Sequence, residues 1–241
     1  MNPYRERFYR SQALYHGYHT RAQAEEAHRA RLRYYEWYTR AWLPESRSAK
    51  ILDIGCGCGQ FLYFLQHQRF VDCAGIDVDA AQVRIGNELG LKCRAADALT
   101  YLTQEDAAYD LVTMFDIIEH FAKPELAGVL DAVRERTRAG GKLIVSVPNA
   151  ESPVGGAARY CDLTHELSFT TASLSTLLRL HGFDQIVWRD AWPAPVTAAR
   201  RIYRTVAGVS RAIEGVRLRL LGLSPPRIWS PVLYACAVRS E

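Results

Sequence analysis

The sequence predicts an α/β fold, in which a seven-stranded, mostly parallel sheet carries helices on both of its faces. Three observations lead to this fold class. Short apolar segments alternate with helical segments between residues 49 and 149, glycines stand at alternate positions after the first apolar segment, and aspartates end the next ones. Such alternation produces parallel strands joined by crossover helices, and ligands then bind beyond the carboxyl ends of the strands. We therefore expect a binding site at that edge of the sheet.

The length of 241 residues and a hydrophobic content of 49% are enough for one sizeable core. We expect residues 1–48 to form an N-terminal helical lid or cap and residues 49–241 to form one domain. Within that domain, residues 150–172 are expected to be a substrate loop, and residues 195–228 a basic helical insertion before the last strand.

The N-terminal segment predicts a helix over residues 22–43, ended by Pro44 and Ser46. Aromatic side chains at helical spacing usually face a core, which favours a helix packed on the sheet. The alternative is a lid over the binding site. Candidates for lid side chains are Tyr15, His16, Tyr18 and His19.

The central segment predicts strands near residues 50–54, 72–77, 91–96, 109–115 and 142–147, and helices near residues 60–68, 80–89 and 124–138. An irregular segment follows over residues 150–172. A helix over residues 173–180 and a strand over residues 185–189 come next, and the last strand covers residues 232–238.

The turn after the first strand reads D-x-G-x-G-x-G, with Asp53 at its start and Gly55, Gly57 and Gly59 at alternate positions. Glycines here let a ligand lie against bare main chain at the N-terminus of a helix. Dinucleotide-binding turns usually read G-x-G-x-x-G instead. An acid at the start suits a ligand that carries an amine, which Asp53 either contacts or serves indirectly by orienting amides or water. A tight turn without a ligand is the alternative.

The second strand ends at Asp77, where a carboxylate can accept hydrogen bonds from both hydroxyls of a ribose. The alternative for Asp77 is a helix N-cap. Asp97 ends the third strand in the same way, and it could also be only a cap.

The order and spacing of these motifs resemble those of the class I, Rossmann-like, S-adenosylmethionine (SAM) dependent methyltransferases. The resemblance implies SAM as cofactor and S-adenosylhomocysteine as product, with Asp97 accepting a hydrogen bond from the adenine amino group. It also implies that the end of the fourth strand faces the methionine part of SAM. The implied cofactor-binding residues are Asp53, Gly55, Cys56, Gly57, Gly59, Asp77, Val78, Asp97, Ala98 and Phe115.

The pattern from Asp162 through Thr164, His165, Phe169 and Thr170 is similar to a narrower subgroup, the methyltransferases of bacterial surface-polysaccharide and lipopolysaccharide pathways. This resemblance implies O-methylation of a sugar in a surface glycan or its precursor. The expected substrate residues are Asp116, Glu119, Asn149, Arg159, Tyr160 and Asp162.

A sugar hydroxyl is a weak acid, so its methylation calls for a general base. His120, just beyond the fourth strand, and His165, in the polar loop, are the candidates, because histidine titrates near neutral pH. For each histidine the alternative is an imidazole that caps a helix or bonds within the core.

Other acceptors remain open at this point. A small molecule such as a quinone, a lipid precursor or a natural product would need the same cofactor motifs. A SAM-binding pseudoenzyme is the non-enzyme alternative. Methylation of nucleic-acid bases is disfavoured, because the Asn- or Asp-Pro-Pro-aromatic run typical of those enzymes is replaced here by residues 115–118.

The bulk composition limits the partners. Six scattered cysteines, without a C-x-x-C pair or a histidine at ligand spacing, indicate neither a zinc site nor a disulfide framework, so we expect no metal. A net charge of +4 does not call for nucleic acid. No secretory or membrane-spanning segment is recognisable, and a cytoplasmic location is expected.

Residues 199–221 alternate apolar and basic residues at helical spacing. A basic amphipathic helix predicts contact with a membrane surface or a partner, which would make the protein peripheral at the inner face of the cell membrane. The alternative is a solvated helix packed against the sheet edge. The sequence leaves the oligomeric state open.

Overall fold

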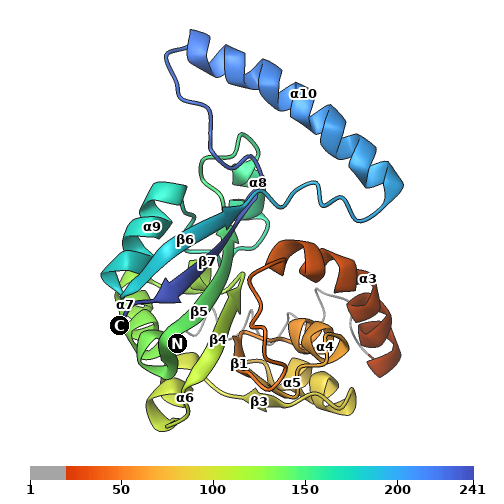
Figure 1. Ribbon diagram of the computed structural model, residues 1–241, viewed down its shortest axis with the longest axis vertical. Helices are drawn as coiled ribbons and strands as arrows, with labels where there is room; N and C mark the ends of the chain where they lie inside the picture. The colour runs from red at the N-terminus through yellow and green to blue at the C-terminus, as the bar shows by residue number, and fades with distance from the viewer. Residues whose placement is uncertain (1–19) are drawn as a thin grey trace.

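A computed structural model describes residues 20–241 of the chain, shown in Figure 1. The lid candidates Tyr15, His16, Tyr18 and His19 lie outside the described residues. The centre of the fold is a seven-stranded sheet in the order β3-β2-β1-β4-β5-β7-β6. Its strands are β1 (Lys50–Ile54), β2 (Asp72–Asp77), β3 (Cys93–Ala95), β4 (Tyr109–Phe115), β5 (Thr137–Pro148), β6 (Phe183–Arg189) and β7 (Val232–Arg239).

Strands β1 to β5 pair in parallel, and β7 runs antiparallel to both of its neighbours, β5 and β6. The chain order reverses between β1 and β4, which lie side by side with Asp53 opposite Thr113. Ligands of such sheets bind at this reversal, beyond the carboxyl ends of the strands. The topology confirms the predicted fold class.

One face of the sheet is covered by the N-terminal helix and the two helices that follow β1 and β2. These are α3 (Arg21–Thr39), α4 (Gln60–His67) and α5 (Ala80–Glu88). Phe61 and Phe64 of α4 pack there with Ile51 and Leu111 of the sheet. Tyr35 of α3 lies edge-on to Phe61 and near Phe115. The aromatic side of α3 therefore packs on the domain, as its spacing predicts.

The opposite face is covered by α6 (Ala98–Gln104), α7 (Lys123–Arg136) and α9 (Thr171–Leu180). Leu52 and Ile54 point to this side, whereas Ile51 points to the other, because successive side chains of a strand alternate between its faces. Both faces of β1 are therefore buried, and this explains its continuous apolar sequence.

Several predicted boundaries were wrong. Helix α3 ends at Thr39 rather than Leu43, because Ala41 takes a positive φ of 66° and turns Trp42 back into the core. Strand β3 is shorter than predicted, since it pairs with β2 over Gly75–Asp77 alone. Helix α6, the single turn η1 (Ile118–His120) and helix α8 (Gly155–Tyr160) were not predicted, because each is too short to show a helical period.

The basic insertion forms a long helix, α10 (Ala198–Leu220), which stands away from the rest of the molecule in Figure 1. Gly215 is its one buried residue. The helix is therefore solvated, as the alternative expected, but it does not pack along the sheet edge. Within residues 20–241, no helix is both long and apolar enough to cross a membrane.

Candidate active site

The glycine turn lies against the end of β2. The backbone amides of Gly55 and Cys56 both donate to the carbonyl oxygen of Ile76, at 2.8 and 3.0 Å. Gly57 has a φ of 53°, and a Cβ there would lie 2.8 Å from Oε1 of Gln82. The positive φ explains why the turn favours glycine at residue 57, since the end of the Gln82 side chain could move aside.

Asp77 fixes the turn from the adjacent strand. Its Oδ2 accepts a hydrogen bond from the amide of Gly57 and its Oδ1 accepts one from the amide of Asp79, each at 2.8 Å. Asp79 is the N-cap of α5, so the alternative role of Asp77 as that cap is wrong. Burial raises the pKa of Asp77, and the two amides oppose this shift by stabilising the carboxylate.

Asp53 lies buried at the reversal point of the sheet. Its Oδ1 accepts a hydrogen bond of 2.6 Å from the hydroxyl of Thr113 on β4. Burial raises the pKa of Asp53 to about 7, although the bond from Thr113 lowers it. A positively charged group placed beside Asp53 would restore the ionised form.

These residues line one cavity of about 620 Å³ at the carboxyl edge of the sheet. Asp97 lies on its wall and is also the N-cap of α6, since its side chain accepts from the amide of Thr100. The cavity brings together most of the predicted cofactor-binding residues: Asp53, Gly55, Cys56, Gly57, Asp77, Val78, Asp97, Ala98 and Phe115.

Helix α3 supplies a wall of this cavity through Arg31 and Tyr35, which sequence reasoning missed. The two residues lie four apart and therefore share one side of the helix. His28, one turn earlier, holds α3 to the glycine turn, because its Nε2 lies 3.0 Å from the carbonyl oxygen of Cys58. The aromatic spacing of α3 predicted a packed side, but nothing in the sequence showed that this side continues into the site.

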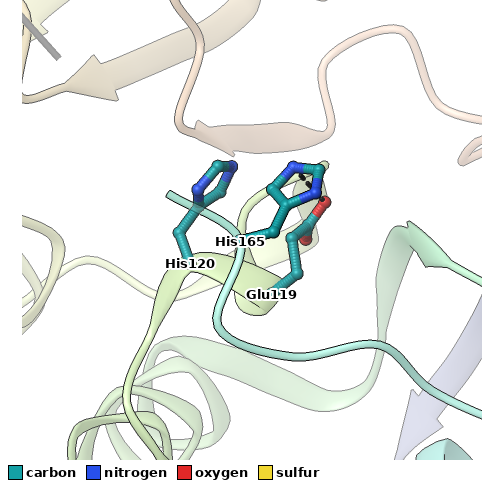
Figure 2. Close-up of side chains that lie close together, drawn as sticks. All are labelled: Glu119, His120 and His165. Carbon is teal, nitrogen blue, oxygen red and sulfur yellow. Dashed lines mark ion pairs between the residues drawn. The ribbon is translucent and has the colours of Figure 1, made fainter. Parts of the chain in front are cut away.

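The far end of the cavity holds a cluster of ionisable side chains (Figure 2). Glu119 and His120 come from η1, and His165 comes from the loop between α8 and α9. The rings of His120 and His165 lie edge-to-face with their centroids 4.7 Å apart. Asp116 and Asp162 also line this end, so the cavity gathers the predicted bases and three predicted substrate residues.

The hydrogen bonds of His165 fix its tautomer. Nδ1 lies 3.1 and 3.2 Å from the carbonyl oxygens of Ala158 and Arg159. Carbonyls only accept, so Nδ1 must carry the proton, and Nε2 of a neutral ring keeps its lone pair.

His120 is oriented by a chain of two hydrogen bonds. The hydroxyl of Thr164 donates to Oδ1 of Asp162 at 2.7 Å and lies 2.9 Å from Nδ1 of His120. Since the hydroxyl has one proton, Nδ1 of His120 donates to it. Burial alone would raise the pKa of Asp162, but the hydrogen bonds from Thr164 and the nearby histidines lower it, which keeps Asp162 ionised.

Glu119 is fully buried, and neither of its side-chain oxygens has a hydrogen-bond partner among residues 20–241. Burial is the main cause that raises the pKa of Glu119 well above the ordinary value, and repulsion from Asp116 is the second. Oε1 of Glu119 lies 3.9 Å from Nε2 of His165.

Glu119, His120 and His165 form a grouping that could also hold a cation. Each residue offers one ligand atom, and these three atoms lie within 4.8 Å of one another. The sequence did not predict this grouping, because His165 follows 45 positions after His120 in the chain.

Asp116 begins the turn that carries this cluster. It has a positive φ of 54°, which is uncommon for a residue other than glycine. The hydroxyl of Ser146 on β5 donates to its Oδ1 at 2.8 Å. Burial raises the pKa of Asp116, while the Ser146 bond lowers it.

Four predicted site residues do not line the cavity: Gly59, Asn149, Arg159 and Tyr160. Gly59 is the N-cap of α4, and a Cβ there would lie 2.5 Å from the side chain of Leu91. The amide of Asn149 is fully buried, where it donates to the carbonyls of Ile228 and Ser230. Tyr160 is 75% exposed beneath the guanidinium of Arg159, which donates to the carbonyl of Glu166. These residues shape the fold or the surface instead.

Comparison with known proteins agrees with this geometry. A family model described as a methyltransferase domain matches residues 26–188, more than half of the chain. The chain belongs to this methyltransferase family. The match begins inside α3 and ends in β6, so it includes every residue of the ionisable cluster.

Curated relatives match a shorter part of this methyltransferase. The ubiquinone biosynthesis O-methyltransferase of Idiomarina loihiensis is 27% identical over 108 residues, which is 42% of each chain. The enzyme of the same name from Pseudomonas aeruginosa is 31% identical over 106 residues, 42% of this chain and 44% of that one. The ajmaline N-methyltransferase of Rauvolfia serpentina is 32% identical over 34% of this chain and 31% of its own. The match therefore spans less than half the length of these relatives.

Solved structures share the fold over most of the chain. A SAM-dependent methyltransferase of Archaeoglobus fulgidus has a TM-score of 0.61 at 18% identity, covering 90% of this chain and 94% of that one. A SAM-dependent methyltransferase of Thermotoga maritima has a TM-score of 0.58 at 17% identity, covering 90% and 96%. The chain therefore has the Rossmann-like fold of SAM-dependent methyltransferases.

The residues of the cavity fit this cofactor. The bare glycine turn leaves room for main-chain contact, and the carboxylates of Asp77 and Asp53 face the same space. Asp53 is a buried acid with a raised pKa, which an ammonium group would neutralise.

Proposed function

We propose that this enzyme methylates an acceptor hydroxyl and that either His165 or His120 accepts the proton of that hydroxyl. The observation that carries the proposal is the orientation of the two imidazoles. Each ring is held by hydrogen bonds at Nδ1, which makes Nε2 the unprotonated nitrogen of each neutral ring. Both histidines line the same end of the cavity.

The proposed cofactor contacts follow from the positions of the acids. The carboxylate of Asp77 would accept from the ribose hydroxyls, Asp97 from the adenine amino group, and Asp53 would face the ammonium of the methionine part. Main chain at Gly55 and Gly57 would lie against the cofactor. SAM, when bound, supplies an electrophilic methyl group on a sulfonium.

The chain's own residues then have two tasks. The walls of the cavity exclude water and orient the acceptor, which accounts for most of the rate enhancement in such transfers. The imidazole Nε2 takes the hydroxyl proton as the oxygen becomes nucleophilic. Asp162 supports this step at His120, because through Thr164 it favours the tautomer with an unprotonated Nε2 and stabilises the imidazolium that forms.

For the acceptor we favour a sugar hydroxyl of a bacterial surface glycan or its precursor. A carbohydrate presents several hydroxyls, and this end of the cavity offers Asp116, Asp162 and the two histidines as hydrogen-bonding partners. Asp162 and His165 belong to the sequence pattern that resembles the surface-polysaccharide subgroup.

A second candidate acceptor is a small phenolic molecule such as a quinone precursor. The names of the ubiquinone O-methyltransferase relatives favour it. Phe115, Phe121 and Tyr35 on the cavity wall could contact an aromatic ring. A phenol is more acidic than a sugar hydroxyl and depends less on a base, so the effect of the histidine substitutions would separate the two candidates.

The test gives the purified protein SAM with a labelled methyl group together with fractionated bacterial extracts. Label in glycolipid and polysaccharide supports the sugar acceptor, and label confined to small molecules moves the phenolic acceptor to first place. Label in nucleic acid or protein contradicts both candidates. Binding of SAM without any S-adenosylhomocysteine, in every fraction, indicates a pseudoenzyme. The Asp77→Ala variant serves as the background control.

A further inference from the structure

Helix α10 exposes a continuous apolar stripe. Ile202, Val206, Val209, Ile213, Val216 and Leu220 recur every three or four residues, and they are between 56% and 83% exposed. This spacing places all six on one side of the helix. An apolar stripe of this length is not expected to remain in water, because contiguous exposed apolar surface usually marks a binding site.

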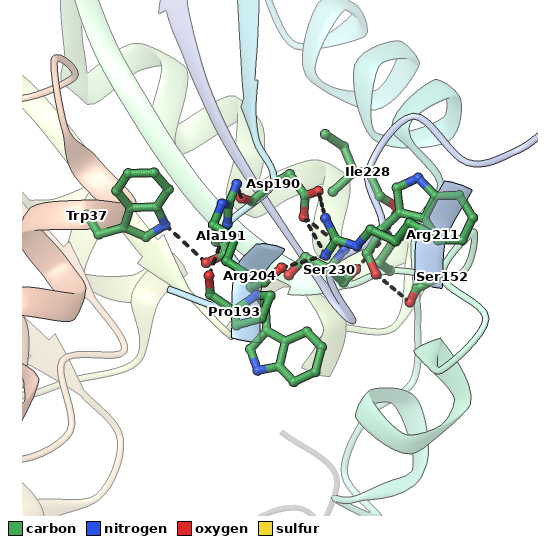
Figure 3. Close-up of polar contacts among 12 residues, drawn as sticks. Trp37, Ser152, Asp190, Ala191, Pro193, Arg204, Arg211, Ile228 and Ser230 are labelled. Atoms are coloured by element: carbon green, nitrogen blue, oxygen red, sulfur yellow. Dashed lines mark hydrogen bonds and ion pairs between the residues drawn. The ribbon is translucent and has the colours of Figure 1, made fainter. Parts of the chain in front are cut away.

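The opposite side of α10 is held to the domain by polar contacts (Figure 3). Arg204 donates to the carbonyls of Pro193 and Asp190, at 3.0 and 3.2 Å. Arg211 forms an ion pair with Asp190 and also donates to the carbonyl of Trp192. Asp190 in turn accepts from the amide of Ser230 at 3.1 Å. The contacts fix which side of the helix faces the domain, so the apolar stripe faces outward.

Charge is concentrated on the same helix. Helix α10 contains six arginines and one glutamate, a formal charge of +5. The whole chain carries +4, so the remaining residues sum to −1. At 100° per residue, Arg201 and Arg219 border the apolar stripe on one edge and Arg217 borders it on the other. An arginine in such a position can lay its methylene stem along apolar surface while its guanidinium stays in polar surroundings.

We propose that α10 docks this methyltransferase on an anionic lipid surface, with the apolar stripe below the headgroups and the bordering arginines among the phosphates. Amphipathic helices with this arrangement lie in the plane of the interface. Each arginine near an anionic surface strengthens binding about fivefold. The docking does not depend on which acceptor is methylated.

Charge also distinguishes this occupant from two others. A second copy would bring the basic borders of two α10 helices together, where like charges repel. Residues 1–19 contain three arginines and one glutamate, so they share the positive sign of the helix. Of these three occupants, only an anionic bilayer complements both the apolar stripe and its charged borders.

The test measures sedimentation of the full chain with vesicles of phosphatidylcholine, alone or mixed with phosphatidylglycerol. We expect binding to the mixed vesicles that weakens at high salt, and at least tenfold less binding to phosphatidylcholine alone. Arg201→Gln combined with Arg219→Gln should weaken binding to the mixed vesicles by about 25-fold, since each arginine accounts for about fivefold.

A matched pair of variants isolates the apolar stripe. Val209→Asp places a carboxylate in the stripe, whereas Gly208→Asp places the same charge on the neighbouring residue, where a Cβ meets open space. We expect Val209→Asp to bind the mixed vesicles at least tenfold more weakly than Gly208→Asp, with the SAM affinity of both unchanged. Equal binding by the two variants would overturn the proposal. So would a wild-type protein that ignores the vesicles but forms a dimer that Val209→Asp dissociates.

Discussion

The carboxylate of Asp77 accepts a hydrogen bond from the backbone amide of Gly57 at 2.8 Å. This contact joins the end of β2 to the turn after β1, two segments that both line the proposed cofactor site. This hydrogen bond uses one lone pair of Oδ2, and the hydrogen bond from the amide of Asp79 uses one lone pair of Oδ1. Each oxygen has a second lone-pair direction, so both can still accept from a diol.

We expect Asp77→Ala to weaken SAM binding at least about 100-fold, because two hydrogen bonds to a charged acceptor are lost at about 1.5 kcal/mol or more each. Calorimetric titration with SAM measures the effect. Asp72→Ala, at the exposed start of the same strand, is the matched control and should bind as the wild type does. Retained affinity in a folded Asp77→Ala variant would remove Asp77 from the cofactor site.

Asp53 should make SAM affinity depend on pH. In the free protein its pKa is raised to about 7 by burial. The ammonium of SAM favours the carboxylate, so binding would release a proton below that pH. We expect affinity to fall by up to about tenfold per pH unit below 7, and to level off above it.

Calorimetry in buffers of different ionisation enthalpy detects the released proton. Asp53→Asn keeps an oxygen for the Thr113 hydroxyl but has no titrating proton, so its SAM affinity should be lower and its pH dependence flat. A wild-type affinity that is constant between pH 5.5 and pH 8 would show that Asp53 does not face the ammonium.

The sequence predicted correctly which strand ends meet at the cavity, because this part of the wall is built from consecutive strand ends. Asp53, Asp77 and Asp97 each end or follow a strand, and parallel topology brings such residues to one edge. The role of Asp79 as the cap of α5 was missed, since two acids two residues apart are equivalent candidates until the backbone is known.

The acceptor half was predicted less completely. His165 and Glu119 are 46 positions apart, and the loop of His165 is held near η1 by the amides of Glu166 and Leu167, which donate to the carbonyl of Glu119. Backbone contacts of this kind depend little on side-chain type, so the sequence does not reveal them. The same holds for Arg31 and Tyr35, whose position depends on how α3 packs.

His165→Ala and His120→Ala should each retain SAM binding but lose turnover. Removal of a general base typically lowers kcat by about 100- to 10,000-fold. His67→Ala, on the exposed end of α4, is the control for loss of a histidine. Full activity in both site variants would exclude histidine base catalysis.

Glu119 gives a prediction about stability. Its raised pKa means that the folded protein keeps a proton that the unfolded chain releases above the ordinary value. The contribution of Glu119 to stability is therefore full below its ordinary pKa and is lost as pH rises from that value through the raised pKa of the folded state, at about 1.4 kcal/mol per pH unit for one proton. Glu119→Gln imitates the neutral carboxyl, so in the presence of a chelator it should be at least as stable as the wild type at pH 8, with a weaker dependence on pH.

Urea denaturation at several pH values, with EDTA present, measures this difference. Glu88→Gln, which removes a carboxylate from the exposed side of α5, should leave the slope unchanged. Repeating the comparison with added Mg²⁺, Mn²⁺ or Zn²⁺ distinguishes a neutral Glu119 from an ionised one. If a divalent ion stabilises the wild type but not Glu119→Gln, the ion is held by the carboxylate, because an amide is a much weaker ligand. That result would contradict a neutral Glu119 in the working enzyme and make the cluster with His120 and His165 a cation site rather than a pair of bases.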